Sequence, residues 1–311
     1  PTYLFIASVF IMIGTGLFKV LNGEPIDAPS AHYDVTIAEQ VGNIGSVAFI
    51  LLLLRAFASG CSALTGIEAI ANGVPAFRVP KVKNAQVTMV LMGAAAVTMF
   101  IGITALALKS GVHYAENPCE QLETWAQCAT DPQMSVMAQI AHAVFGGNTF
   151  MFYVIQAGTA LVLLLAANTA FNGFPLLSSV LAKDKFAPKA LLTRGDRLVY
   201  SNGMFSLMAA ALALILVYQA SVTGLIQLYI LGVFTSFTVG QIGMLRHWRR
   251  GMADGSITKA SARSGLIING LGATLTGAVL VIVTITKFQH GAWLVFIIMP
   301  VLFTVMFYTH R

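Results

Sequence analysis

Charged residues are scarce in this sequence, where Asp, Glu, Lys and Arg together make up only 10% of 311 residues. Soluble globular domains carry roughly 25%. Hydrophobic residues reach 57% and the mean hydropathy is +0.79. A water-soluble domain could not bury that much apolar surface, so most of it is expected to face lipid. The composition excludes a secreted enzyme, a nucleic-acid-binding module and a disordered scaffold.

Signatures of catalysis and of metal binding are also missing. The sequence has no H-E-x-x-H motif, no G-x-S-G within an apolar stretch and no pair of intramembrane aspartates, and its glycines fit neither phosphate-binding pattern. The six histidines fall in loops or at the ends of apolar stretches. We therefore expect no enzyme activity and no cofactor. Because Pro1 leads directly into an apolar run, we also expect the chain to be part of a longer protein.

Long apolar stretches are what the sequence has instead. A helix needs about 20 apolar residues to cross the hydrocarbon core of a bilayer. Eight stretches qualify, and together they predict an all-α integral membrane protein. They are residues 2–21, 46–76, 86–108, 150–181, 201–219, 222–245, 266–286 and 292–309.

Basic residues are distributed unequally among the loops that join these stretches. Loops 77–85, 182–200 and 246–265, with Arg311, hold fourteen of the eighteen Lys and Arg residues, whereas the alternate loops hold only Lys109 and Lys287. Because cytoplasmic loops retain basic residues, this predicts that both ends of the chain are cytoplasmic. The net charge of +6 then reflects topology. The alternative is that residues 246–250 bind a cyclic nucleotide or an anionic lipid.

The long outer loop, residues 109–149, contains two of the three cysteines. Cys119 and Cys128 would lie on the oxidising side of a plasma membrane, where they either form a disulfide or remain free thiols. After them, apolar residues recur at helical spacing over residues 134–144, which predicts a short amphipathic helix on the outer surface.

Two of the eight stretches are longer than a straight crossing needs and carry glycines beside hydroxyl or amide side chains. In residues 46–76, Gly60 and Gly66 flank Ser62 and Thr65, which compete for backbone hydrogen bonds and favour unwinding. Unwound backbone within a membrane must be buried in protein or line a polar cavity, and many transporters bind ions or substrates at such breaks. The alternative is a kink or tilt that serves packing.

Glu68 is the only acidic residue inside any predicted span. An ionised carboxylate in hydrocarbon costs several kcal/mol, so Glu68 is expected to face a wet cavity, pair with a base or stay protonated. Thr65 and Asn72 share its helix face. The three side chains could supply oxygen ligands to a hard monovalent cation, or a protonated Glu68 could simply hydrogen-bond for packing.

Polar side chains in two other spans are further candidates. Asn168 and Thr169 lie in the fourth stretch, and Tyr229 lies in the sixth. Small polar residues often join helices to one another, so each has a packing explanation beside a role in lining a site. Tyr229 differs because a phenol can both coordinate a cation and close a pocket.

Four sequence motifs resemble those of a known transporter family and occur in the same order. Residues 55–85, RAFASGCSALTGIEAIANGVPAFRVPKVKNA, are similar to the sixth transmembrane segment and the following inner loop of the amino acid–polyamine–organocation (APC) superfamily of transporters. The S-A-L-T-G-I-E-A core, with NTAFNGFPLLSSVLAKDKFAPKAL, TRGDRLVYSNG and LYILGVFTSFTVGQ, most resembles the KimA-type bacterial potassium importers.

This resemblance implies a LeuT-like fold of twelve helices, of which the chain would hold spans five to twelve. The chain would then be a single, partial transmembrane domain over residues 1–311, with about eight helices, two of them interrupted. Residues 2–21 would be the last helix of the first repeat, 46–245 the second inverted repeat, and 266–309 two extra helices. The first helix, which normally faces the sixth across the substrate site, would be absent.

The resemblance further implies proton-coupled potassium symport by a homodimer in the bacterial plasma membrane. Matched by motif, Thr65 would be a cation ligand, Glu68 a proton-linked carboxylate and Tyr229 a third contact to potassium. The unwound carbonyls near Ser62 would add ligands, and Gly60, Gly66 and Asn72 would line the site.

Two alternatives stay open. The first is a proton-coupled amino acid or polyamine permease of the same fold, because a Gly/Ser-rich break could also hold a substrate carboxylate. The second is a membrane structural or sensing fragment that transports nothing. In each case membrane lipid is an expected partner and nucleic acid is not.

Overall fold

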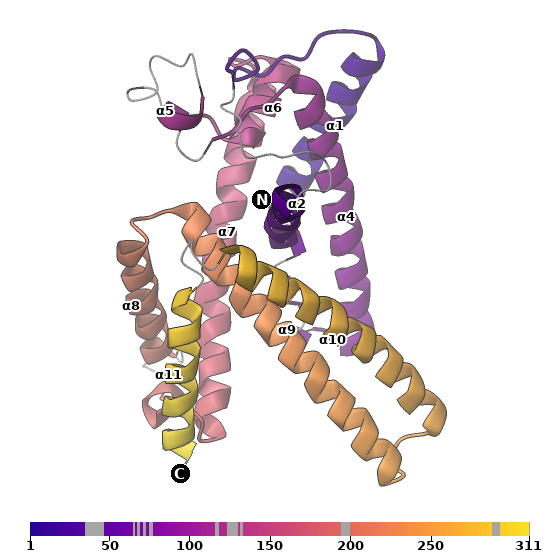
Figure 1. Cartoon of the computed structure of the whole chain (residues 1–311), viewed down its shortest axis with the longest axis vertical. Coiled ribbons are helices and arrows are strands. Elements are labelled where there is room, and N and C mark those ends of the chain that lie inside the picture. Colours follow the sequence, from indigo (N-terminus) through magenta and orange to yellow (C-terminus); the bar gives the residue numbers. More distant parts are fainter. Residues whose placement is uncertain are drawn as a thin grey trace. The chain divides into compact units, whose positions relative to one another are not determined.

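The computed structural model describes residues 1–34, 47–64, 66, 69–70, 73–74, 77–115, 118–122, 130, 133–193, 200–287 and 293–310 (Figure 1). The regular elements in these ranges are helices, as the sequence predicts. The chain divides into two compact units. The first consists of Pro1–Glu39 and Gly73–Ala170, and the second of Gln40–Asn72 and Phe171–Arg311.

Five helices within the described ranges are long and apolar enough to cross a membrane. They are α1 (Thr2–Leu21), α4 (Lys81–Ser110), α7 (Phe150–Lys183), α9 (Val222–Ala253) and α10 (Lys259–Lys287). Shorter apolar helices occupy parts of the three other predicted spans, namely α2 (Val47–Gly60), α8 (Ser201–Val217) and α11 (Trp293–His310). Every predicted span therefore contains an apolar helix, and eight crossings stay a prediction.

The first unit is built around a buried apolar cluster between α1, α4 and α6 (Val136–Phe145). Met12 of α1, Leu106 of α4 and Ile140 of α6 are completely buried there. α6 confirms the amphipathic helix predicted over residues 134–144, and its apolar face packs on this cluster. Lys19 also links α1 to α6, because its ammonium group donates to the Val144 carbonyl at 2.9 Å.

A buried hydrogen-bond network attaches the segment after α1 to α6. The Gln139 side chain is 1% exposed; its Oε1 accepts from the Ser30 hydroxyl, and its Nε2 donates to the Met134 carbonyl at 2.9 Å. The His113 amide donates to Ser30 Oγ at 2.8 Å. Because each polar group of Gln139 has a partner, an amide can be buried on the apolar face of α6.

In the second unit, α9 and α10 form an antiparallel pair (Figure 1). Thr238 of α9 donates to Thr276 of α10 at 3.1 Å. Nearer the turn, Gly265 lies against the Trp248 indole ring, and a Cβ at Gly265 would come within 2.6 Å of Trp248 Cδ2. Glycine at the crossing lets the two backbones approach closely, as is common between membrane helices.

The predicted loop over residues 246–265 is helical over most of its length, whereas its cytoplasmic location stays a prediction. α9 continues to Ala253, α10 begins at Lys259, and only the short turn between them is irregular. The sequence analysis placed the ends of the predicted spans where the hydropathy of the sequence falls. A helix does not need apolar residues to continue, however, and Arg and Met are good helix formers. The basic side chains Arg246, Arg249 and Arg250 therefore lie on helix rather than on loop.

Candidate functional site

The chain leaves α-helical geometry in the middle of the second predicted span. α2 ends at Gly60, a 3-10 turn η1 covers Cys61–Leu64, and Gly66 has a φ of +99°. No atom lies within 4 Å of a Cβ built at Gly66, so glycine is favoured there by backbone conformation and not by space. The predicted interruption of this span is confirmed.

A side chain contributes to the break. The Ser62 hydroxyl donates to the Ser59 carbonyl at 2.7 Å. Such a bond offers the backbone an alternative to the regular i to i−4 ladder. Glycine at position 60 also lowers the helix propensity by about 1 kcal/mol relative to alanine. The break thus follows from the same residues that predicted it.

The end of α2 and the turn η1 pack in one apolar cluster with α9 and α10. Ala58 and Cys61 are buried in one cluster with Ile230, Leu231 and Phe234 of α9, joined by Val283 of α10 and Val295 of α11. Ala58 is fully buried, and α2 packs mainly against α10, while the turn η1 after it contacts α9. The apolar side of the broken helix is therefore packed against other helices of the second unit.

Tyr229 lies on α9 next to this cluster. Its side chain is 44% exposed, whereas the adjacent Ile230 is 2% exposed. Cys61, which precedes Ser62 in the chain, and Ile230, which follows Tyr229, lie in the same apolar cluster. Gly60, Ser62, Gly66 and Tyr229 all belong to the second unit.

Gln227 is a polar residue that the sequence analysis did not single out. It is 4% exposed, and its Oε1 has no hydrogen-bond partner among the described residues. With Ile230, Leu231 and Phe234 it forms a stripe at i, i+3, i+4 and i+7 on α9. A buried amide oxygen without a donor is costly, which makes Gln227 a candidate oxygen ligand. An amide on the apolar stripe of a membrane helix is the signal that could have identified it.

The second predicted interruption is wrong, because α7 is one continuous helix over Phe150–Lys183. The Thr169 hydroxyl donates to the Leu165 carbonyl at 2.9 Å. A hydroxyl bond to the carbonyl four residues earlier is compatible with the helix. Pro175 also lies inside this helix. A Cβ added to Gly203 of α8 would lie 3.0 Å from the Cα atom of Pro175. The hydroxyl, amide and proline residues here are therefore part of a continuous helix and do not end it.

Asn168 and Thr169 are exposed on α7 and belong to the first unit. The break of α2 belongs to the second unit, and each unit is described by itself. A role for these two residues in lining the site therefore stays a prediction.

Three of the predicted ligands lie outside the described residues: Thr65, Glu68 and Asn72. The potassium site predicted at Thr65, Glu68 and Tyr229 is thus untested at two of its three positions. In the described ranges, no three His, Cys, Asp or Glu residues come together as a metal site.

Cysteine chemistry is partly determined. Cys119 of the short helix α5 (Pro118–Gln121) is disulfide-bonded, while Cys61 is a buried free cysteine in the apolar cluster. The expected partner Cys128 lies outside the described residues. Cys61 therefore acts as a small packing residue within that cluster.

Comparison with known proteins gives two results. Residues 1–307 match the model of a family described as amino acid permease. The chain is also 40% identical over 307 residues to the potassium transporter KimA of Bacillus subtilis (strain 168). That similarity covers 99% of this chain and 46% of the relative. The chain therefore spans about half the length of the curated protein that it matches.

Proposed function

Because this chain belongs to the amino acid permease family, we propose that it is part of a transporter that imports potassium together with protons. It is a multi-pass membrane protein with the apolar helices of a transporter family. The observation that carries the proposal is the break at Gly60–Gly66, whose turn η1 packs against α9. The 40% identity to a potassium transporter supports the choice of ion.

The break supplies the kind of ligand that a dehydrated cation needs. Backbone carbonyls released from a helix can replace the hydration shell of potassium, as they do in selectivity filters. Ser62 and Tyr229 add hydroxyl oxygens, and Gln227 adds a buried amide oxygen without a described donor. Thr65 would complete this set from its position in the sequence.

Coupling to protons would depend on Glu68. As a carboxylate, Glu68 contributes a full negative charge beside the cation; as a carboxylic acid it contributes none. Protonation on one side of the membrane would therefore weaken cation binding there, and deprotonation on the other side would restore it. The two ions would be coupled through one titrating group.

The proposed orientation follows the basic residues. Lys183 and Arg250 lie in the last turns of α7 and α9, at ends that would face the cytoplasm of a bacterial cell, as would both termini. A homodimer remains part of the proposal through the resemblance alone.

One other function has an observation in its favour. The matching family is described by amino acids and not by ions, and a Gly/Ser-rich break could bind the carboxylate of an amino acid through helix amides. A polyamine would instead suit the acid at position 68.

Rubidium uptake tests the proposal. The full-length protein is expressed in a host that lacks its own potassium uptake, and the initial rate is measured with and without excess amino acids or polyamines. We expect uptake that these compounds leave unchanged and that Glu68→Gln abolishes or uncouples from pH. Glu24→Gln, a substitution in the loop after α1, is the matched control and should leave the rate unchanged. Unchanged uptake in Glu68→Gln would disprove the role of Glu68, and competition by amino acids would favour the permease.

A further inference from the structure

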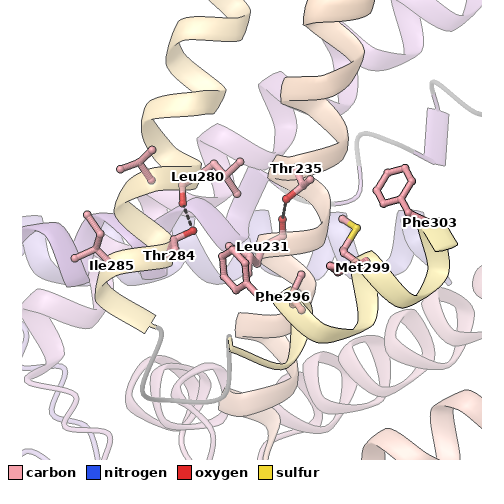
Figure 2. Close-up of a pocket in the computed structure, with 11 residues that line it drawn as sticks. Leu231, Thr235, Leu280, Thr284, Ile285, Phe296, Met299 and Phe303 are labelled. Carbon is pink, nitrogen blue, oxygen red and sulfur yellow. Dashed lines mark hydrogen bonds between the residues drawn. The ribbon is translucent and has the colours of Figure 1, made fainter.

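An apolar cavity of about 480 Å³ lies between α9, α10 and α11 of the second unit (Figure 2). Leu231, Phe296 and Met299 are among the side chains that line it, and none of the described lining residues is titratable. The volume falls within the range of roughly 300–1,000 Å³ that is typical of ligand sites.

Among the described lining residues, two threonines carry hydroxyl groups, and both hydroxyls bond within their own helices. Thr235 Oγ1 donates to the Leu231 carbonyl and Thr284 Oγ1 to the Leu280 carbonyl, each at 2.7 Å (Figure 2). A buried water needs two to four polar partners, and the cavity offers few. Because α9 and α10 are membrane-length apolar helices, the hydrocarbon chain of a lipid is the ligand that suits this cavity.

A second cavity, of about 390 Å³, lies at the C-terminal ends of α7 and α11 and is basic. Lys185, Lys189 and His310 line it, together with Thr309 and small apolar residues. Asp184 precedes Lys185 in the chain, but no carboxylate is among the described lining residues. Two ammonium groups and an imidazole suit a phosphate.

The turn after α7 holds Lys185 in this position. The Phe186 amide donates to the Leu181 carbonyl at 2.8 Å, and the Lys185 amide donates to the Ala182 carbonyl at 3.2 Å. This is a Schellman motif, in which glycine usually occupies the left-handed position; here Lys185 occupies it with a φ of +65°. Phe186 then stacks on His310, with ring centroids 4.3 Å apart. Glycine would be less strained at this position, whereas lysine adds an ammonium group to the lining of the basic cavity.

One face of α11 connects the two cavities. Met299, Phe303, Phe307 and His310 follow one another at i, i+4, i+8 and i+11, which places them on one side of the helix. Phe303 and Phe307 are each 64% exposed. From Met299 to His310 the helix rises about 16 Å at 1.5 Å per residue. That rise is close to the roughly 15 Å of one leaflet of the hydrocarbon core.

We propose that an anionic phospholipid of the cytoplasmic leaflet binds along this face of α11. Its phosphate lies at Lys185, Lys189 and His310, and one acyl chain extends past Phe307 into the apolar cavity. Leu231 and Val295 line that cavity and also pack with Ala58 and Cys61 beside the break of α2. A bound acyl chain therefore completes the packing that supports the broken helix.

Lipid binding to the delipidated full-length protein tests the headgroup. We expect dioleoyl phosphatidylglycerol to bind more tightly than dioleoyl phosphatidylcholine in native mass spectrometry. The double substitution Lys185→Gly/Lys189→Gln should weaken phosphatidylglycerol binding roughly twenty-five-fold, because each lysine near a membrane surface contributes roughly fivefold. Glycine suits the backbone at position 185, so this loss cannot come from misfolding there, and Lys189→Gln alone should give roughly fivefold. Equal binding of the two lipids, or no effect of the double substitution, overturns the proposal.

A second set of variants tests the acyl chain. Thr284→Leu and Thr235→Leu each fill part of the apolar cavity, and each should weaken phosphatidylglycerol binding while the melting temperature without lipid stays unchanged. Inorganic phosphate at millimolar concentration should not displace the lipid. Displacement by phosphate, with no effect of either leucine, would identify a site for a free anion and overturn the proposal. A shift from dimer to monomer in either variant would assign the cavity to a second copy and overturn it too.

Discussion

A Cβ added to Gly102 of α4 would lie 2.6 Å from Cδ1 of Ile13 on α1. Ile13 is β-branched and 8% exposed, within the cluster that forms the core of the first unit. Its γ-methyl group and Cγ1 are also within 3 Å of the added atom. The side chain thus has little freedom to move aside, and glycine sets the distance between the two helices.

Replacing Gly102 by alanine is expected to destabilise the first unit. Overpacking a well-packed site costs about 1–3 kcal/mol, which exceeds the gain of about 1 kcal/mol that alanine brings to a helix interior. Gly93→Ala is the matched control on the same helix, since a Cβ there has no neighbour within 4 Å. In thermal unfolding of the purified protein in detergent, Gly102→Ala should lower the melting temperature and Gly93→Ala should not. Equal melting temperatures would contradict the close packing.

The break of α2 gives a second prediction, for Gly66→Ala. Alanine at a φ of +99° costs about 1–3 kcal/mol, and the cheapest relief is to rebuild the break. Initial rates of rubidium uptake by the full-length protein should therefore fall severalfold. Gly240→Ala in α9 is the control, because its Cβ would meet no atom within 4 Å and its backbone is helical. If both variants transported like the parent, the conformation at Gly66 would have no part in transport.

Features set by residues close together in the sequence could be predicted, whereas features set by contacts between distant residues could not. The apolar helices and the break at Gly60–Gly66 follow from local composition, and both were predicted. The continuity of α7 was not, because the same residue types can end a helix or back-bond within it, as Thr169 does. The extension of α9 to Ala253 was missed because hydropathy reports the membrane boundary and not the helix boundary.

Burial of polar side chains was the least predictable property. Gln139 and Gln227 look alike in the sequence, and both are nearly fully buried. Gln139 is hydrogen-bonded to Ser30 and Met134, which are 109 and 5 residues away. Gln227 Oε1 has no partner in the described ranges. Only the tertiary arrangement separates a satisfied structural amide from a candidate ligand. Thr65 and Glu68 stay predictions, because they lie outside those ranges.

Cys119 gives a third prediction, which tests its expected pairing with Cys128. Without reductant, the denatured protein should react with maleimide at Cys61 and not at Cys119, because of these two described cysteines Cys61 is a free thiol and Cys119 is disulfide-bonded. Reductant should make Cys119 reactive, and peptide mapping should show a crosslinked peptide that contains Cys128. In the control Cys128→Ser, Cys119 should react without reductant. A crosslink to any other cysteine would show that the expected pairing is wrong.

Asp254, at the turn between α9 and α10, gives a prediction for pH. Its carboxylate accepts from the Ser256 hydroxyl at 2.7 Å and from the Ser256 amide at 3.1 Å. These hydrogen bonds stabilise the charged form and lower the pKa of Asp254 below its ordinary 3.8, with a smaller contribution from nearby His247. A lowered pKa means that the turn is stabilised above the ordinary value, and that this stabilisation is lost as the pH falls through the lowered pKa.

Amide hydrogen exchange over residues 254–258 should therefore be slow near neutral pH, once corrected for the intrinsic rate. Protection should decrease as the pH falls below the ordinary value of 3.8 and through the lowered pKa of Asp254, where the carboxylate takes up its proton. Ser256→Ala removes the hydroxyl donor, so the pKa of Asp254 should rise towards its ordinary value and the loss of protection should begin at higher pH. Protection at the distant Ser30 and Gln139 network, which contains no carboxylate, is the internal control. If protection at the turn stayed constant over this range, the hydrogen bonds to Ser256 would not depend on the charge of Asp254.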